Sequence, residues 1–222
     1  METAELKATS TIESTHPAVV HFTARHTGGV TNEAERAVRL FYAVRDGFRY
    51  DPYQIDLTVA GMKASRTLEI ERGWCVSKAV LLAACCRSLG IPARLGFADV
   101  RNHLSTARLR ERMRTDIFYW HGYTEMLLDG KWVKATPAFN IELCEKFGLL
   151  PLEFDGSDDS LYHPFDAAGN RHMEYVTQRG AYTDLPIEEI IQTFRKEYSF
   201  GDWKPEPHAP SFDEDVERET SR

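Results

Sequence analysis

Residues 73–94 read GWCVSKAVLLAACCRSLGIPAR, and this stretch decides the fold. Between residues 76 and 89 the apolar side chains cover a broad face at helical spacing, and Gly90 follows where such a helix should end. The pattern therefore predicts a central buried helix. Cys75 stands at its start, where we expect its thiol to face the N–H groups of the first helical turn.

The residues before this helix predict smaller elements. Residues 32–44 carry apolar positions at helical spacing with charges between them, which predicts an amphipathic helix, and residues 64–71 predict a short helix. The β-branched and aromatic residues of 18–27 predict a leading edge strand. Residues 48–52 are interrupted by Pro52 and are expected to form a structured loop.

The residues after the helix predict strands. Residues 93–100 read as a strand, and the arginine-rich residues 101–114 predict a surface loop or a short helix. Residues 117–128 and 131–139 flank Asp129-Gly130, a pair that tolerates the positive φ angles of a tight turn. This arrangement predicts a β-hairpin.

Helices come mainly first and strands later, an order that favours an α+β fold in which an antiparallel sheet packs against the helix that follows Cys75. Beyond residue 140 the clearest pattern is a helix over 185–198. We expect one domain, with the following division: 18–201 for the domain, about 31–140 for its motif-bearing core, 141–201 for an extension, and 1–17 and 202–222 for flexible termini.

Composition excludes several classes of protein. The net charge of −7 argues against general nucleic-acid binding, and the longest apolar run, 79–86, is too short to span a membrane. Residues 1–17 lack the pattern of a secretory signal, so the expected location is the cytoplasm. The four cysteines do not form a disulfide framework and are expected to be reduced thiols.

Cys75 and His121 are candidates for a nucleophile and its general base. A thiol becomes reactive when a helix N-terminus and an imidazolium stabilise its thiolate. His121 lies in the middle of a predicted strand, from which its ring can reach the end of the helix. Taken alone, each residue is more readily explained as packing, because most free cysteines are small core residues. The pair indicates chemistry.

At this point the chain resembles the transglutaminase-like superfamily, a papain-like group in which a Cys at a helix N-terminus is followed by a His on a strand. The resemblance covers roughly residues 31–139 and rests on GWCVSKAVLLAACCRSLGIPAR and on residues 121–139, HGYTEMLLDGKWVKATPAF. It implies a Cys/His/Asp-type site that forms a thioester with amide or related acyl substrates. It does not identify the acceptor of the acyl group.

The third member of the expected triad departs from the family pattern. Thr136 stands where the family usually has an aspartate, just before a proline. Hairpin pairing about Asp129-Gly130 places Thr136 opposite Tyr123, two residues from His121, so its hydroxyl could accept a hydrogen bond from the imidazole. Asn140 is the alternative orienting residue. A hydroxyl cannot balance the charge of an imidazolium as a carboxylate does.

The remaining candidates are weaker. Tyr50 and Trp74 could flank the acyl pocket and bind an oxyanion or a substrate side chain, although aromatic residues near a core helix more often pack. Cys85 and Cys86 fall inside the apolar helix and are expected to pack there. The arginines could bind an anionic group of the substrate, although a solvated surface is the simpler interpretation: Arg101, Arg108, Arg110, Arg112 and Arg114.

No resident metal or cofactor is expected. Several histidines lack the short spacing of metal ligands: His16, His21, His26, His103, His163, His172 and His208. The leading hypothesis is a cysteine-dependent enzyme that hydrolyses an amide or peptide bond of a peptide, protein or small amide through a Cys75 thioester, with His121 as general base. The alternatives are a transglutaminase or amide-forming acyltransferase, and a non-catalytic binding module with a degenerate triad. The oligomeric state is not predicted.

Overall fold

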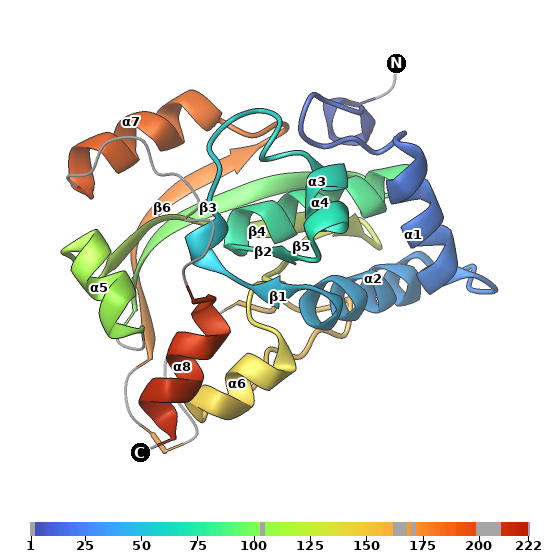
Figure 1. Ribbon diagram of the computed structural model, residues 1–222. Helices are drawn as coiled ribbons and strands as arrows, with labels where there is room; N and C mark the ends of the chain where they lie inside the picture. Colours follow the sequence, from blue (N-terminus) through green and yellow to red (C-terminus); the bar gives the residue numbers. More distant parts are fainter. Residues whose placement is uncertain (1–2, 103–104, 162–167, 170–171, 199–209, 222) are drawn as a thin grey trace.

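The protein combines a layer of helices with an antiparallel sheet (Figure 1). The computed structural model describes residues 3–102, 105–161, 168–169, 172–198 and 210–221. Within these residues, the α+β prediction is confirmed. No helix in the described part is both long and apolar enough to cross a membrane.

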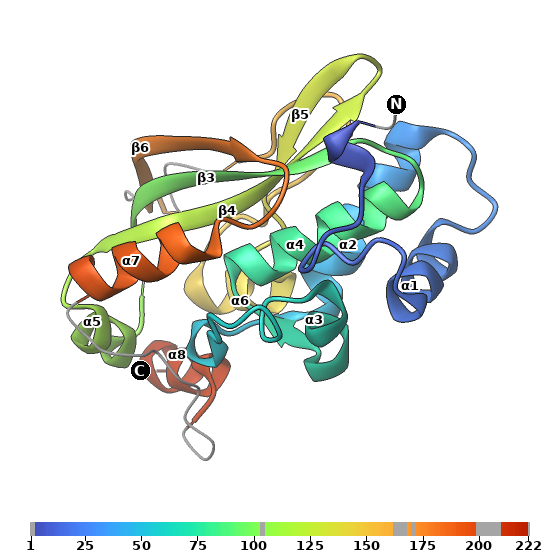
Figure 2. The same ribbon diagram turned by 90° about the horizontal axis from the view of Figure 1, so that it is seen from above.

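The predicted central helix is α4 (Cys75–Ser88), and each of its residues from 75 to 87 is buried. One side of α4 contacts the sheet, and other helices cover the rest: α1 (Pro17–Thr27), α2 (Glu33–Gly47) and α3 (Ala64–Ile70). Figure 2 shows α4 between the sheet and these helices. This enclosure explains why the apolar face of α4 is so broad.

The sheet has the strand order β5-β4-β3-β6, and its strands are β3 (Ala93–Asn102), β4 (Ile117–Leu128), β5 (Lys131–Ala135) and β6 (Met173–Tyr182). The β4–β5 hairpin is confirmed. Asp129 and Gly130 have φ angles of 49° and 78°, as a two-residue turn with the twist of a hairpin requires. β5 is shorter than predicted, and its pairing with β4 ends at Thr124 and Ala135.

The other elements are short. They are η1 (Ala4–Leu6), β1 (Arg49–Tyr50), η2 (Pro52–Gln54), β2 (Arg72–Gly73), α5 (Ala107–Met113), α6 (Ile141–Phe147), α7 (Ile187–Glu197) and α8 (Phe212–Thr220). β1 and β2 pair in parallel, so the expected loop over 48–52 contains a two-residue strand. α5, α7 and α8 gather at the end of the molecule where α4 begins (Figures 1 and 2).

One expectation was wrong. Residues 18–27 form most of helix α1 instead of an edge strand, because Pro17 begins the helix and His16 Nδ1 caps the Ala18 N–H at 3.2 Å. Val19, Thr23 and Thr27 then recur at four-residue spacing and are buried together.

The described parts of the two chain ends pack against the core. Ile12 is fully buried, and Phe212 and Val216 of α8 are 3% and 0% exposed. A capping box between Ser211 and Glu214 begins α8. Residues 202–209 of the expected tail lie outside the described residues.

Candidate active site

Cys75 is the first residue of α4, and the turn that leads into the helix explains the glycine at position 73. Ser77 Oγ accepts a hydrogen bond from the Trp74 N–H at 3.0 Å, which satisfies one amide of the helix start. A Cβ on Gly73 would collide with this same Ser77 Oγ. The chain therefore passes from β2 into α4 at a position where only glycine fits without rearrangement.

His121 lies on β4, and the next residue, Gly122, brings that strand against the start of α4. A Cβ on Gly122 would lie 3.0 Å from the Cα of Val76, closer than most Cβ contacts in proteins. The Gly122 backbone N–H also lies near the Cys75 sulfur and acts to lower the pKa of its thiol. Because β5 pairing ends at Thr124, this part of the β4 edge meets the N-terminus of α4. The neighbour of the predicted base thus contacts the predicted nucleophile.

Cys75 and His121 line the same cavity, which has a volume of about 20 Å³. That volume holds about one water molecule. The walls are mainly apolar: Tyr50, Pro52, Ile55, Trp74, Leu109, Met113, Phe118, Tyr119, Phe194 and Tyr198. With Cys75 3% and His121 2% exposed, the site is closed to any larger ligand in this conformation.

Burial keeps both reactive groups neutral. It raises the pKa of the Cys75 thiol to about 12, against hydrogen bonds from the Gly122 and Val76 backbone that favour the thiolate. It also lowers the pKa of His121 to about 3, with a smaller contribution from the charge of His172. In the closed conformation near pH 7, the pair is therefore a thiol and a neutral imidazole.

Helix α7 closes the cavity from one side. The Phe194 ring lies 5.9 Å from the Trp74 ring, and the Tyr198 hydroxyl accepts a hydrogen bond from the Tyr119 N–H at 2.9 Å. Burial raises the pKa of Tyr198, and the nearby Cys75 adds to that effect. The end of α7 is therefore placed directly over the nucleophile.

Tyr50 and Trp74, the two predicted substrate-binding residues, both reach the cavity. The Tyr50 ring packs edge-on against Phe139 at 4.8 Å and against Phe212 of α8 at 5.6 Å. Trp74 is 5% exposed, and its indole Nε1 has no hydrogen-bond partner among the described residues. A buried N–H donor without an acceptor is available to a carbonyl oxygen.

The structure does not connect either predicted orienting residue to His121 by a hydrogen bond. Thr136 is 1% exposed, and its hydroxyl has no partner within the described ranges. The backbone of Thr136 pairs instead with Ser160, at 3.0 Å. Asn140 Oδ1 accepts from the Tyr50 N–H at 3.0 Å and so holds β1. The orienting role of Thr136 stays a prediction.

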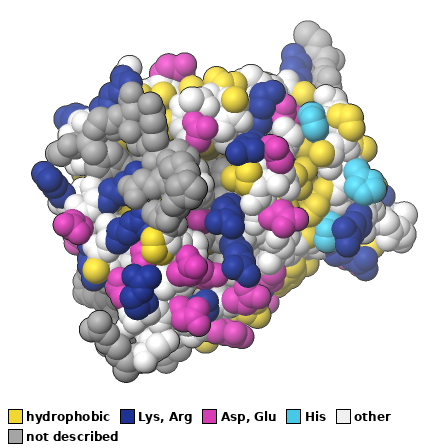
Figure 3. Space-filling view, viewed as in Figure 1, with side chains coloured by type: hydrophobic (Ala, Val, Ile, Leu, Met, Phe, Trp, Pro, Cys, Tyr) yellow, Lys and Arg dark blue, Asp and Glu magenta, His cyan; other side chains and the backbone are white. Residues whose placement is uncertain are grey.

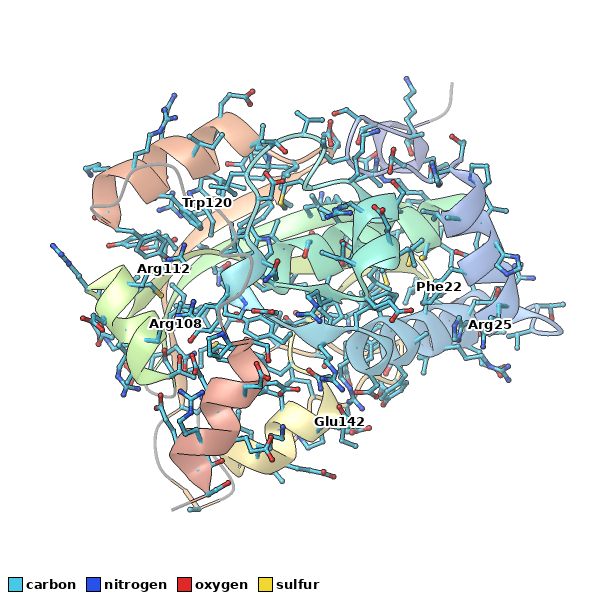
Figure 4. The ribbon with its side chains drawn as sticks, viewed as in Figure 1. Phe22, Arg25, Arg108, Arg112, Trp120 and Glu142 are labelled. Atoms are coloured by element: carbon cyan, nitrogen blue, oxygen red, sulfur yellow. The ribbon has the colours of Figure 1, made fainter. Side chains whose placement is uncertain are left out.

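The arginine-rich stretch divides between β3 and α5. Arg101 pairs with Asp116 at 3.0 Å, whereas Arg108 projects from α5 toward α8 and reaches Asp215 at 3.6 Å (Figure 4). On the face drawn in Figure 3, acidic and basic side chains are interspersed. Arg101 and Arg108 are thus paired within the protein, and no anion site follows from them.

The other predicted candidates lie away from the site. Cys85 and Cys86 are fully buried in α4, as their packing interpretation requires. Among the described residues, no group of His, Cys, Asp or Glu side chains is arranged to hold a metal ion. His103, His163 and His208 lie outside those residues.

Sequence reasoning missed several residues near the site: Asp99, His172, Phe194 and Tyr198. Phe194 and Tyr198 fell within the predicted helix over 185–198, but no local pattern shows that its end covers Cys75. His172 is 3% exposed and lies next to β6, a strand that was not predicted. Asp99 lies inside β3, where a carboxylate gives no local signal of its partners.

Comparison with known proteins places this geometry in a family. The sequence pattern of the transglutaminase-like superfamily matches residues 20–137, which include Cys75, His121 and Thr136. No curated protein matches the chain in sequence. Solved structures with a similar course include a candidate cysteine protease from Cytophaga hutchinsonii and a candidate protease from Parabacteroides distasonis.

Both solved structures are distant. The first is 16% identical with a TM-score of 0.49, and the match covers 81% of this chain and 46% of the other. The second is 16% identical with a TM-score of 0.37, covering 56% and 27%. The chain thus spans less than half the length of these structures. On the sequence match, which extends over more than half of its residues, the chain belongs to the transglutaminase-like superfamily.

Proposed function

We propose that the chain is a cysteine-dependent acyl-transfer enzyme that hydrolyses an amide or peptide bond through a thioester on Cys75. The observation that carries the proposal is the cavity that Cys75 and His121 line together, because a nucleophile and its base must meet in one site. The close approach of Gly122, the residue after His121, to the start of α4 supports the same assignment. The family of the chain makes a cysteine enzyme the expected class.

The reaction starts with transfer of the Cys75 proton to His121. The sulfur then attacks the substrate carbonyl carbon, and the tetrahedral intermediate collapses as His121 returns the proton to the leaving amine. The indole N–H of Trp74 is a donor available to the carbonyl oxygen during these steps. Water, deprotonated by His121, then attacks the thioester and releases the acid and the free thiol.

Substrate entry requires a more open conformation than the one described. A cavity of about 20 Å³ does not hold a peptide carbonyl together with its neighbours. Displacement of Phe194 and Tyr198 would enlarge it and would also hydrate both reactive groups. Hydration moves both pKa values toward their ordinary range, so opening and activation would coincide.

The acceptor of the acyl group is a separate question. If a primary amine reached the thioester faster than water, the same residues would act as a transglutaminase or an amide-forming acyltransferase. The apolar walls favour a substrate with an apolar group beside the reacting carbonyl. A cytoplasmic location, which would keep Cys75 reduced, remains part of the proposal.

Iodoacetamide labelling tests the chemistry. Modification of Cys75, located by peptide mass spectrometry, is followed as a function of pH in the wild type and in His121→Ala, with Cys75→Ser as the blank. We expect His121→Ala to move the pH profile toward that of an ordinary thiol, with a pKa of about 8.5. An unchanged profile would favour the non-catalytic binding module. Incubating acyl donors with a labelled amine then separates hydrolysis from transfer.

A further inference from the structure

An irregularity in the sheet lies directly before His121. Ala98 pairs with His121 and Val100 pairs with Phe118, so one residue of β3 faces two residues of β4. The two β4 residues that face Asp99 are Tyr119 and Trp120, so β4 carries one extra residue. Such a β-bulge redirects the side chains that follow it, because strand residues alternate between the two faces of a sheet.

The backbone of the bulge adopts a conformation that its sequence does not favour. Trp120 has a φ angle of 58°, in the left-handed region that residues with a Cβ rarely occupy. Nothing about a tryptophan selects this conformation locally. Contacts from elsewhere in the fold must therefore hold it.

Two side chains hold the freed amides of the bulge. The Trp120 N–H donates to Asp99 Oδ1 at 3.1 Å, and the Tyr119 N–H donates to the Tyr198 hydroxyl at 2.9 Å. Asp99 occupies the single β3 position that faces the bulge. Its carboxylate thus replaces the missing partner in the strand pairing.

Asp99 is itself fixed in place. It is 5% exposed, and its Oδ1 also accepts from Arg179 Nε at 2.5 Å. Arg179 is an extra residue on β6, because Phe97 pairs with Gly180 and Ala98 with Gln178. The Arg179 guanidinium lies 4.5 Å from the Trp120 ring centre, and Trp120 in turn lies against α7 (Figure 4).

We propose that Asp99 is a positioning residue, which fixes the backbone of Trp120 in the bulge and so directs His121 to Cys75. The inference rests on the proposed function only in assigning a reaction to that pair. Without an acceptor at position 99, Trp120 loses the contact that keeps its φ angle positive. The strand then relaxes toward regular pairing, which turns the His121 ring away from the nucleophile.

The test compares Asp99→Ala and Asp99→Leu, which remove the acceptor, with Asp99→Asn, which keeps an oxygen for the Trp120 N–H. The first readout is the titration of the His121 ring by NMR, and the second is the pH profile of Cys75 labelling by iodoacetamide. The matched control is Glu125→Ala. Glu125 is 5% exposed and pairs with Arg94 at 2.6 Å on the same strands, away from the bulge.

We expect Asp99→Ala and Asp99→Leu to raise the pH at which His121 titrates toward the ordinary value of about 6.5, because the ring leaves its buried position. Their labelling profiles should approach that of His121→Ala, and Asp99→Ala should add nothing when His121 is already absent. Asp99→Asn and Glu125→Ala should resemble the wild type in both readouts.

Three results would overturn the inference: an unchanged His121 titration in Asp99→Ala and Asp99→Leu, an equal effect of Asp99→Ala with and without His121, or a loss in Asp99→Asn as large as in His121→Ala. The Asp99→Asn comparison still tests the inference if Asp99→Ala and Asp99→Leu do not fold. If His121→Ala itself leaves labelling unchanged, the proposed function fails, while the NMR titration still decides whether Asp99 positions the ring.

Discussion

Lys78 should hold together the segments that surround the active site, and replacing it with methionine should destabilise the protein. Lys78 lies one turn after Cys75 and is fully buried. Its ammonium donates to the carbonyl oxygens of Arg45 at 2.8 Å, Phe48 at 2.7 Å and Ala138 at 2.7 Å. These carbonyls belong to α2, the residue before β1, and the segment after β5. Lys78→Met keeps most of the apolar stem and removes the three donors.

The magnitude follows from what the substitution leaves behind. A buried carbonyl without its donor costs about 1–3 kcal/mol, so three of them cost about 3–9 kcal/mol in total. Relief from burying an ammonium offsets part of this loss. We therefore expect Lys78→Met to lower the free energy of unfolding by about 2–4 kcal/mol at neutral pH.

The pH dependence gives a second, independent expectation. Burial lowers the pKa of Lys78 from 10.5 to about 7, so between these values the folded state binds fewer protons than the unfolded chain. The contribution of Lys78 to stability therefore rises with pH across this window, by up to about 1.4 kcal/mol per pH unit. The difference in free energy of unfolding between the wild type and Lys78→Met should therefore also grow as the pH rises.

Urea unfolding followed by circular dichroism measures both effects. Lys131→Met is the control, because the Lys131 side chain is 60% exposed and should change stability by less than about 0.5 kcal/mol. A loss below about 1 kcal/mol in Lys78→Met would refute the role of the three hydrogen bonds. If the stability difference between the wild type and Lys78→Met stays constant with pH, the lowered pKa of Lys78 is refuted.

Three further changes probe the site. Gly122→Ala should lower the free energy of unfolding by about 1–3 kcal/mol and slow Cys75 labelling, because β4 must move away from α4. The control is Gly47→Ala, whose added Cβ meets no atom within 4 Å and should have neither effect. Equal stabilities of the two variants would contradict the close approach of Gly122 to α4. Thr136→Val should leave the free energy of unfolding equal or higher, because it removes a buried hydroxyl without a partner among the described residues. A shift in the pH profile of Cys75 labelling would instead establish Thr136 as the orienting residue. Burial lowers the pKa of His121 to about 3, so between pH 6.5 and 3 the unfolded chain binds a proton at His121 that the folded protein does not. Stability should therefore fall as the pH drops through this range. In acid unfolding curves, the stability of His121→Phe should decline less than that of the wild type.

The sequence predicted the parts of the fold that local signals determine. The helix after Cys75 has an apolar face at helical spacing and a glycine where it ends. The hairpin has a turn, Asp129-Gly130, whose residues tolerate positive φ angles. The helix over 18–27 was mistaken for a strand because its β-branched residues outweighed the four-residue spacing of Val19 and Thr23. α8 was missed although Ser211 and Glu214 form a recognisable capping box.

The parts that long-range contacts determine were not predictable in the same way. Strand β6 is largely exposed, and its pairing with β3 shifts register twice, so it lacks a regular alternation of apolar residues. Trp120, with its positive φ angle, donates its N–H to Asp99, 21 residues earlier in the chain. The resemblance to a family identified Cys75 and His121, but the positions of Phe194 and Tyr198 in the cavity wall follow only from the packing of α7.

The closed cavity also bears on how the protein withstands oxidants. Peroxides attack the thiolate form of cysteine, and only where they can reach the sulfur. Cys75 is 3% exposed, and its thiol, with a pKa raised to about 12, stays protonated. The closed conformation thus shelters the sulfur from conversion to sulfenic or sulfinic acid, and an opening that admits substrate would also expose the sulfur to peroxides.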